Sequence, residues 1–456
     1  MNTREIYNNL FYIESLGCAK NKVDAELISG IMMQNGWVMT PDAEIAKCII
    51  INTCSFLESS RDEASNVIEY YSEIKKRINC KLIITGCLPE RDNEHILSRF
   101  PMIDAIIGIN GYSNIHNFAG KISDEDIEYI PDFSGEYNKE QYITRPLSSG
   151  HGWAYLKIAD GCDNCCTYCA IPGIRGKYHS RPLQDVIDEA KSLVNDRNVK
   201  EIILIAQDTS NYGIDTTGLQ QLSILLDELE NIPNLQWIRI MYTHPAHVSG
   251  EIIAAMSRNK KVLPYIDMPL QHISERILSD MNRKISKDET IKLIQKLKTL
   301  IPDITIRTTF IVGFPGETAE EFDELYDFIK DMKFPRLGVF RYSAEPGTPA
   351  YSMKNQVNSE ISEERFNAIM ELQQKITKNW ANKLIGKELD IILDTPSEEE
   401  LYPGYRYSGR SIHDSPDVDG LVVLRNIAGY SPGDIIKVKI NKNFIYDIGG
   451  YIINPR

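Results

Sequence analysis

The sequence lacks the features that mark a membrane or exported protein. None of the apolar runs in its 456 residues approaches the roughly 18 residues that a membrane helix needs. Its first residues, MNTREIYNNLFYIESLGC, contain no basic stretch followed by an apolar one, which a secretory signal would show. We therefore expect a cytoplasmic protein with no membrane partner.

The sequence also lacks an excess of positive charge. Its 50 Lys and Arg face 64 Asp and Glu, which gives a formal net charge of -14. Tight binding to phosphate backbones depends on clustered Lys and Arg, so this balance disfavours a nucleic-acid partner and suits a basic one. A disulfide framework is disfavoured too, because nine cysteines are an odd number spread along a large intracellular chain. Metal or redox chemistry suits them better.

Hydrophobic patterns divide the chain into three parts. From about residue 10 to 110, short β-rich runs alternate with helical ones, which predicts βαβ units and a parallel sheet. A second series of six strand and helix units predicts an open or partial (β/α) barrel. Short strands such as LYPGYRY and FIYDIGGYII then predict a small antiparallel barrel. We place the domains at residues 1–125, 149–383 and 384–456, with a linker at 126–148.

Four cysteines lie within eight positions of DGCDNCCTYCAIPGIRG, residues 160–176. Cys162 with Cys165 and Cys166 with Cys169 would form two zinc knuckles, but such pairs are normally separated by a dozen or more residues. Alternatively, Cys162, Cys166 and Cys169 give three thiolates for a four-iron cluster and leave one iron open for a ligand. The position directly after a predicted barrel strand, where such folds place their active sites, favours the iron-sulfur alternative.

The motif Cys162-x3-Cys166-x2-Cys169, with Tyr168 before its last cysteine, resembles the signature of radical S-adenosylmethionine (SAM) enzymes. In that family the amino and carboxylate groups of SAM chelate the open iron, and one electron from the cluster releases a 5′-deoxyadenosyl radical. The segments TFIVGFPGET and LIAQDTSNYG resemble family segments after two of the barrel strands.

This resemblance implies SAM contacts at Tyr168, Gln207, Gly313 and Gly316. The alternatives are an ordinary strand-to-helix turn for the two glycines and a capping role for Gln207.

Three further cysteines each fall directly after a predicted strand. Cys18, Cys54 and Cys87 end the segments ESLGC, IINTC and IITGC. Right-handed crossovers place the carboxyl ends of parallel strands on one edge of a sheet, so we expect these thiols to converge and to hold a second cluster. Cys48 and Cys80 begin or precede their strands, and we expect them to be buried packing residues at the opposite edge.

The α/β chain resembles the methylthiotransferases. It has one three-cysteine site on a flavodoxin-like domain and another on a radical SAM barrel, and a small β-barrel that looks like a TRAM domain follows. This resemblance extends along nearly the whole chain. It implies two [4Fe-4S] clusters, the consumption of two SAM molecules, an external one-electron donor such as a flavodoxin or ferredoxin, and a sulfur donor. Family members place a methylthio group on an unreactive carbon, whose C–H bond is too weakly acidic for a side-chain base and so requires a radical. A non-catalytic iron-sulfur scaffold is the alternative from a different class.

The family divides between enzymes that modify tRNA bases and enzymes that modify an aspartate of small-subunit ribosomal protein uS12. The tRNA enzymes usually show a Gly-Cys-Gln-Met-Asn-like run at the first cysteine, whereas this chain has SLGCAKNKVDAE and resembles the uS12 group. YTHPAH, PYIDMPLQHIS and GVFRYSAEPGTPAY match that group as well. Residues 394–419 hold seven acids and two arginines, and we expect them to form a surface that repels tRNA and attracts a basic ribosomal protein.

Other polar residues carry weaker signals. His244 and His247 form an H-x-x-H around Pro245, where zinc is disfavoured. His272 suits either a pocket lining or a structural hydrogen bond. Arg307 lies inside a predicted strand and needs a charged or polar partner, either a neighbouring acid or the SAM carboxylate.

Overall fold

The computed structural model describes residues 9–120, 129–130, 139–150, 152–396, 400–427 and 429–453. The chain divides into two compact units. The first comprises Met1–Ser148, Asp160–Asp163 and Cys169–Arg181, and the second comprises Ser149–Ala159, Asn164–Tyr168 and Pro182–Arg456. Cys162 and Cys169 therefore belong to the first unit and Cys166 to the second.

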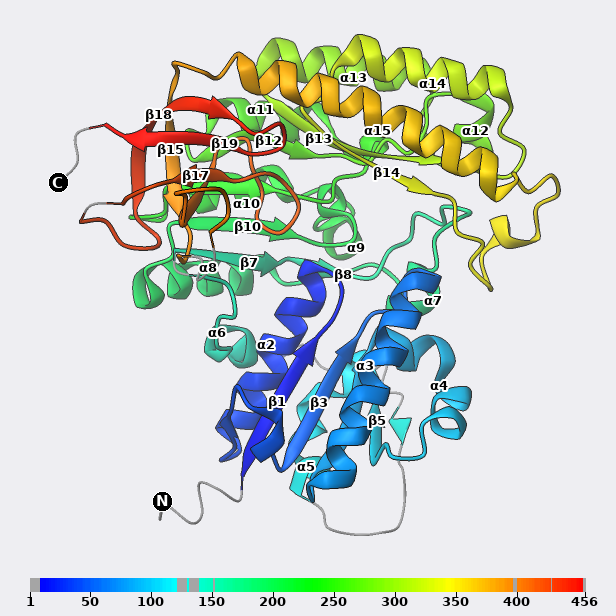
Figure 1. The fold of residues 1–456 in the computed structure, drawn as a ribbon, viewed down its shortest axis with the longest axis vertical. Helices are drawn as coiled ribbons and strands as arrows, with labels where there is room; N and C mark the ends of the chain where they lie inside the picture. The colour runs from blue at the N-terminus through cyan, green and yellow to red at the C-terminus, as the bar shows by residue number, and fades with distance from the viewer. Residues whose placement is uncertain are drawn as a thin grey trace. The chain divides into compact units, whose positions relative to one another are not determined.

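The first unit contains a parallel sheet with the strand order β2-β1-β3-β4-β5-β6 (Figure 1). Its first five strands have the order of flavodoxin-like folds, which confirms the predicted N-terminal fold. The strands are β1 (Leu10–Ser15), β2 (Val38–Met39), β3 (Cys48–Thr53), β4 (Lys81–Gly86), β5 (Ala105–Ile107) and β6 (Tyr129–Ile130). The helices are α2 (Ala19–Gln34), α3 (Glu58–Arg77), α4 (Cys87–Arg99), α5 (Ile115–Gly120), α6 (Lys139–Thr144) and α7 (Ile171–Arg175), with 3-10 turns η1 (Ala43–Ile45) and η2 (Ile109–Asn114). β6 and α6 fall within the expected linker, much of which lies outside the described residues.

Strand β3 is buried on both faces of the sheet. All six of its residues are buried, as expected of a central parallel strand. Ile49 and Ile51 pack into one hydrophobic cluster, and Cys48 and Ile50 pack into another. Burial raises the pKa of Cys80, just before β4, to about 11, and it also raises the pKa of Cys48. The expected packing roles of these two cysteines are confirmed.

The second unit contains a parallel sheet with the order β7-β10-β11-β12-β13-β14, which confirms the six predicted strands of a partial barrel. The strands are β7 (Trp153–Lys157), β10 (Glu201–Ile205), β11 (Trp237–Ile240), β12 (Val262–Asp267), β13 (Thr305–Val312) and β14 (Arg336–Arg341). The short strands β8 (Ala159–Asp160) and β9 (His179–Ser180) flank the cysteine loop in the sequence.

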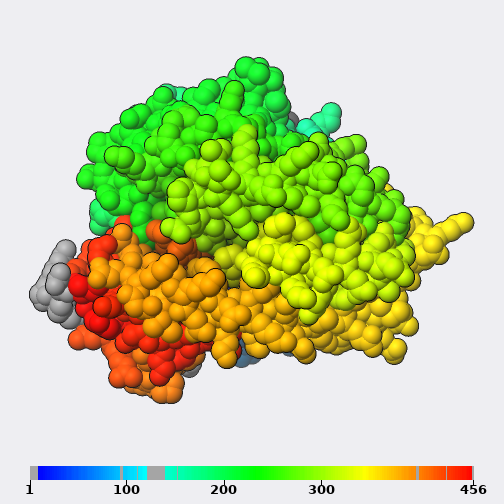
Figure 2. Space-filling view, turned by 90° about the horizontal axis from the view of Figure 1, so that it is seen from above, coloured from blue at the N-terminus to red at the C-terminus, as the bar shows by residue number. Residues whose placement is uncertain are grey.

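Helices follow these strands and cover the sheet. They are α8 (Leu183–Arg197), α9 (Ile214–Thr217), α10 (Leu222–Glu230), α11 (Gly250–Arg258), α12 (Glu275–Asp280), α13 (Lys287–Leu300), α14 (Ala319–Met332) and α15 (Ser359–Asn382), with 3-10 turns η3 (Thr209–Asn211), η4 (Pro245–His247) and η5 (Pro349–Ser352). Capping boxes fix the starts of α13 and α14, through Ser286 with Glu289 and Thr318 with Glu321. Figure 2 shows the yellow-green to orange surface on the side where Figure 1 places α13, α14 and α15, with the red C-terminal residues beside the orange ones. None of the helices in the described part of the chain has the length and apolar content that a membrane crossing requires.

The C-terminal strands form a closed barrel in the order β15-β16-β17-β19-β18. They are β15 (Glu388–Leu393), β16 (Tyr407–Ser411), β17 (Val422–Leu424), β18 (Ile435–Asn443) and β19 (Ile448–Ile452). All pairs are antiparallel except β17 with β19. The small barrel is therefore confirmed.

The strand predicted at LYPGYRY was wrong. The segment turns at Pro403 and Gly404, where Gly404 has a φ of 80° and the Tyr405 N–H donates to the Tyr402 carbonyl at 2.8 Å. Strand β16 therefore begins only at Tyr407. Tyr402 stacks on Phe444, just beyond the end of β18, with 4.0 Å between ring centroids.

Candidate active site

The three N-terminal cysteines lie at the carboxyl ends of neighbouring strands. Cys54 directly follows β3, Cys87 directly follows β4, and Cys18 lies three residues beyond β1, at the residue that precedes α2. Burial raises the pKa of Cys87 to about 12 and also raises that of Cys54, and the charges of neighbouring cysteines add to both increases. Gly17 has a φ of 88°, and a Cβ there would lie 2.9 Å from Cys54 Sγ. The strands thus bring the three predicted thiols together.

A buried arginine accompanies these thiols. The Arg175 side chain, on α7, is 2% exposed and forms ion pairs of 2.9 Å with Asp24 and with Asp160. Its Nη2 lies 3.7 Å from Cys87 Sγ. Burial alone would raise the pKa of Cys18, but the charges of Lys20 and Arg175 and two backbone N–H donors lower it below its ordinary value. Arg175 follows the cysteine motif by six residues, but no pattern in the sequence distinguishes it as a neighbour of Cys87.

A second buried arginine lies beside Cys166 in the second unit. Arg283 Nη1 lies 3.5 Å from Cys166 Sγ and 3.4 Å from the Tyr168 hydroxyl oxygen. Cys166 is buried, whereas Cys165 is exposed with a φ of 49°, and its carbonyl accepts from Asn282 Nδ2 at 3.0 Å. The structure therefore separates two adjacent cysteines into one that faces the arginine and one that faces solvent.

The cysteines suit an iron-sulfur cluster better than a single metal ion. In the described ranges, no three Cys, His, Asp or Glu side chains gather around one point as a single ion requires. A four-iron cluster makes a different demand, because each thiolate binds a different iron. Each three-cysteine set has a buried arginine beside one of its sulfurs, and such N–H groups can donate to the thiolate ligands of a cluster.

Asp208 organises the carboxyl end of β10. It is 1% exposed and accepts hydrogen bonds from Asn164 in the cysteine loop at 2.9 Å, from Ser210 at 2.6 Å and from His247 at 2.6 Å. Burial favours the neutral carboxyl, but hydrogen bonds from these three side chains outweigh it and lower the pKa of Asp208. Asp208 lies within the LIAQDTSNYG segment, but the resemblance of that segment does not distinguish it from its neighbours.

His244 extends the same group. Its ring stacks on His247 with 4.7 Å between centroids, and its Nδ1 accepts from the Ala246 N–H at 3.3 Å. Burial, together with the charge of Arg283, lowers the pKa of His244 to about 2, so its ring is neutral with the proton on Nε2. The two histidines of the H-x-x-H are thus engaged with Asp208 and with the local backbone.

Several buried polar atoms of the second unit make no hydrogen bond to any described residue. Some of them, such as Arg336 Nε and Gln373 Oε1, lie near the amino end of β14. Four others are His244 Nε2, Gln271 Oε1, His272 Nε2 and Arg283 Nε. The residues follow β11 and β12 in the chain, and parallel α/β barrels bind ligands at the carboxyl ends of their strands. A polar ligand such as SAM would satisfy groups that otherwise remain desolvated at a cost. His272 also makes a structural hydrogen bond, because its Nδ1 accepts from the Ser274 N–H at 3.0 Å.

The remaining predicted SAM contacts follow other strands. Gln207 lies two residues beyond β10, and Gly313 directly follows β13. Gly313 and Gly316 have φ values of 72° and 79°. The Glu317 carboxylate accepts from the backbone N–H groups of Gly313 and Phe314, which closes the turn. The strand-to-helix turn therefore explains both glycines, and their contact with SAM stays a prediction.

The predicted acidic surface is wrong for much of residues 394–419. Three of its acids pair with arginines inside the second unit: Asp394 with Arg410, Asp414 with Arg336, and Asp419 with Arg307. Arg307 on β13 and Arg336 on β14 pair with Asp419 and Asp414, far from them in the sequence, whereas Arg410, the partner of Asp394, belongs to the acidic segment itself. Arg307 also pairs with Asp267 at 2.9 Å, so its predicted acidic partner is confirmed. Glu398 and Glu399 lie outside the described residues.

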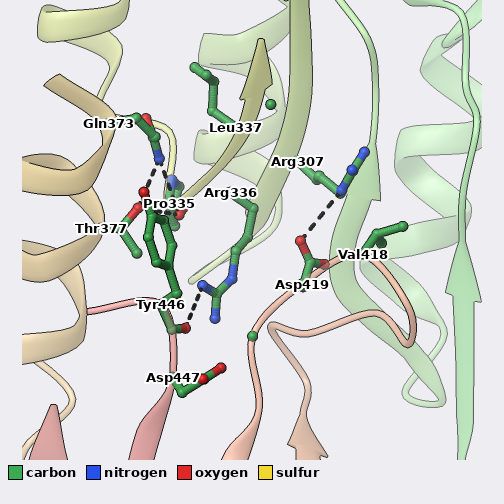
Figure 3. A pocket seen from close by; sticks show the side chains of 12 residues that line it. Arg307, Pro335, Arg336, Leu337, Gln373, Thr377, Val418, Asp419, Tyr446 and Asp447 are labelled. Carbon is green, nitrogen blue, oxygen red and sulfur yellow. Dashed lines mark hydrogen bonds and ion pairs between the residues drawn. The ribbon is translucent and has the colours of Figure 1, made fainter. Parts of the chain in front are cut away.

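A cavity of about 280 Å³ opens beside these ion pairs (Figure 3). It is lined by Arg307 and Arg336 at the amino ends of β13 and β14, and Arg336 donates to the Tyr446 carbonyl at 3.2 Å. Both arginines already have carboxylate partners within the chain. The cavity therefore lies at the end of the sheet opposite the carboxyl ends of the strands, where parallel α/β barrels bind their ligands.

Family models match each part of the chain. Residues 156–329 match the Radical SAM superfamily, residues 10–108 match the Uncharacterized protein family UPF0004, and residues 385–453 match the TRAM domain. A radical SAM barrel joined to a cysteine-bearing flavodoxin-like domain and a TRAM barrel defines a radical SAM methylthiotransferase.

Two curated relatives narrow this class. Ribosomal protein uS12 methylthiotransferase RimO of Desulforamulus reducens is 44% identical over 445 residues, which cover 96% of this chain and 98% of the relative. RimO of Clostridioides difficile is 40% identical over 443 residues, which cover 97% and 98%. The chain therefore belongs to the RimO family and is an enzyme. Membership implies SAM and [4Fe-4S] clusters as cofactors.

A solved structure supports the fold alone. The radical SAM methyltransferase TsrM from Kitasatospora setae, solved with tryptophan and a SAM analogue, has a TM-score of 0.56 and 13% sequence identity. The match covers 85% of this chain and 79% of TsrM.

Proposed function

We propose that this enzyme transfers a methylthio group to the β-carbon of an aspartate in ribosomal protein uS12, in the cytoplasm. The observation that carries the chemistry is the presence of two three-cysteine sites in one chain, each with a buried arginine beside one of its sulfurs. The choice of substrate is supported by the relatives, which are uS12 methylthiotransferases by name and align over nearly their whole length.

The two cysteine sites bind clusters with different functions. Cys162, Cys166 and Cys169 hold the radical-generating [4Fe-4S] cluster, and Cys18, Cys54 and Cys87 hold the auxiliary one. When bound, the two clusters and SAM supply the 5′-deoxyadenosyl radical, the sulfur and the methyl group. Two SAM molecules are consumed, one for the radical and one for the methyl group.

The protein's own groups orient SAM and exclude water. Tyr168, Gln207, Gly313 and Gly316 contact SAM, and the neutral His244 offers an N–H donor beside Arg283. Neutral donors suit this site, because a further charged group would raise the cost of burial next to the cation. An external one-electron donor, such as a flavodoxin or ferredoxin, and a sulfur donor complete the reaction.

Mass spectrometry after anaerobic cluster reconstitution tests this function. The enzyme is incubated with SAM, reductant and sulfide against uS12 and, separately, against bulk tRNA. A methylthio mass gain on a uS12 aspartate, with unmodified tRNA, is the expected result. Modified tRNA with unmodified uS12 would contradict the substrate. An absence of SAM cleavage in every reaction would instead favour a non-catalytic scaffold.

A further inference from the structure

Arg283 is a buried cation held against a cysteine of the candidate active site. It follows α12 in the chain and is 4% exposed. One guanidinium nitrogen reaches Cys166 and Tyr168, and the other, Nη2, donates to the Pro269 carbonyl at 2.6 Å. These contacts fix the guanidinium plane toward the cysteine.

The charge of Arg283 has no carboxylate partner in the described part of the chain. Its contacts there are to a sulfur, a phenol oxygen and a carbonyl oxygen. By contrast, Arg239, Arg336 and Arg410, which are buried in the same unit, each form an ion pair with a carboxylate. Burial of a charge without a counter-charge costs several kcal/mol. An anionic group at Cys166 would provide that counter-charge.

We propose that Arg283 raises the one-electron reduction potential of the cluster held at Cys166. This inference rests on the proposed function, because it takes Cys166 as a cluster ligand. Reduction adds one electron to the cluster and neither makes nor breaks a bond. The added negative charge at the sulfurs is stabilised by an adjacent N–H donor and by a cation that forms no direct ion pair with a carboxylate of the described residues. Arg283 is a positioning residue, since it acts through Cys166.

The test measures the potential of this cluster alone. Full-length protein carrying Cys54→Ala is reconstituted anaerobically, so that the radical-site cluster gives the signal in electron paramagnetic resonance. Dithionite supplies the electrons in a potentiometric titration. Arg283→Met and Arg283→Lys are compared with the parent and with Arg258→Met. Arg258 is the matched control, because its side chain is 49% exposed and pairs with Asp227 at the surface of the same unit.

The proposal predicts a graded result. At the midpoint potential of the parent, the ratio of reduced to oxidised cluster should fall at least tenfold in Arg283→Met, which corresponds to about 59 mV for one electron. The ratio should fall less in Arg283→Lys, which keeps the charge but loses the fork of donors. Arg258→Met should match the parent.

Several results would overturn the proposal. Equal midpoint potentials in the parent and Arg283→Met, at equal iron content, would do so. The proposal would also be contradicted if both Arg283→Met and Arg283→Lys lost their iron or their fold. Arg283→Lys retains the positive charge, which should preserve the cluster site. If Arg283→Met alone loses its iron, Arg283→Lys decides: a midpoint potential below that of the parent supports the proposal, and an equal one contradicts it. A radical-site signal that survives Cys166→Ala would instead contradict the proposed function.

Discussion

The Arg175 guanidinium and the Asp24 carboxylate form a buried ion pair, with 2.9 Å between Nη2 and Oδ2. Their side chains are 2% and 0% exposed, and Asp24 belongs to α2, the helix that Cys18 precedes. Because Asp24 would be left buried without its partner, Arg175→Met should lower the free energy of unfolding by about 3–5 kcal/mol. Urea unfolding of the cluster-free protein, followed by circular dichroism, measures this loss.

The matched control for Arg175 is Arg77→Met. Arg77 pairs with Glu44, but the two side chains are 61% and 46% exposed, so this variant should lose no more than about 1 kcal/mol. The double variant Arg175→Met/Asp24→Asn should recover part of the loss, since it no longer buries an unpaired carboxylate. Equal losses in Arg175→Met and Arg77→Met would show that the buried pair does not stabilise the N-terminal unit.

His413 should make the stability of the second unit depend on pH. Burial, assisted by the charges of Arg336 and Arg239 and opposed by that of Asp414, lowers the pKa of His413 to about 4. Between pH 6.5 and pH 4 the unfolded chain therefore binds a proton that the folded chain does not. From pH 7 to pH 5 this difference should remove about 2 kcal/mol of stability.

Urea unfolding at the two pH values, followed by tryptophan fluorescence, measures this effect. His413→Gln should lose about 2 kcal/mol less than the wild type between pH 7 and pH 5. Thr305, whose hydroxyl lies 2.7 Å from His413 Nδ1, can also bond the glutamine amide. The same loss in His413→Gln as in the wild type would refute this assignment.

Gly313 should tolerate no side chain, whereas Gly316 should tolerate a small one. A Cβ at Gly313 would lie 2.0 Å from Ser362 Oγ, while the atom nearest a Cβ at Gly316 is 3.5 Å away. Both have positive φ, so both alanine variants lose about 1–2 kcal/mol to backbone strain. Gly313→Ala should lose a further 1–3 kcal/mol or so to the steric clash.

The double variant Gly313→Ala/Ser362→Gly isolates the clash, because it removes the Ser362 side chain and keeps the strained backbone. Thermal unfolding should place its stability close to that of Gly316→Ala. Similar stabilities of Gly313→Ala and Gly316→Ala, with no recovery in the double variant, would contradict the close packing at Gly313.

The sequence predicted those features that depend on local order along the chain. Apolar runs located the strands of both parallel sheets, and the positions of Cys18, Cys54 and Cys87 after three of them predicted their convergence. Arg283 was not predicted, because 117 positions separate it from Cys166 in the sequence and no local pattern indicates the contact. Asp419 was misjudged for the same reason, since its charge is visible in the sequence but its partner Arg307 is not.

The division of work between the two cysteine sites is tested most directly by one paired measurement. Mass spectrometry quantifies 5′-deoxyadenosine and methylthiolated uS12 in the same reactions of wild type, Cys166→Ala and Cys54→Ala. The wild type should form both products, Cys166→Ala should form neither, and Cys54→Ala should still cleave SAM but leave uS12 without the methylthio group. Methylthiolated uS12 from Cys54→Ala, or SAM cleavage by Cys166→Ala, would contradict the two-site account.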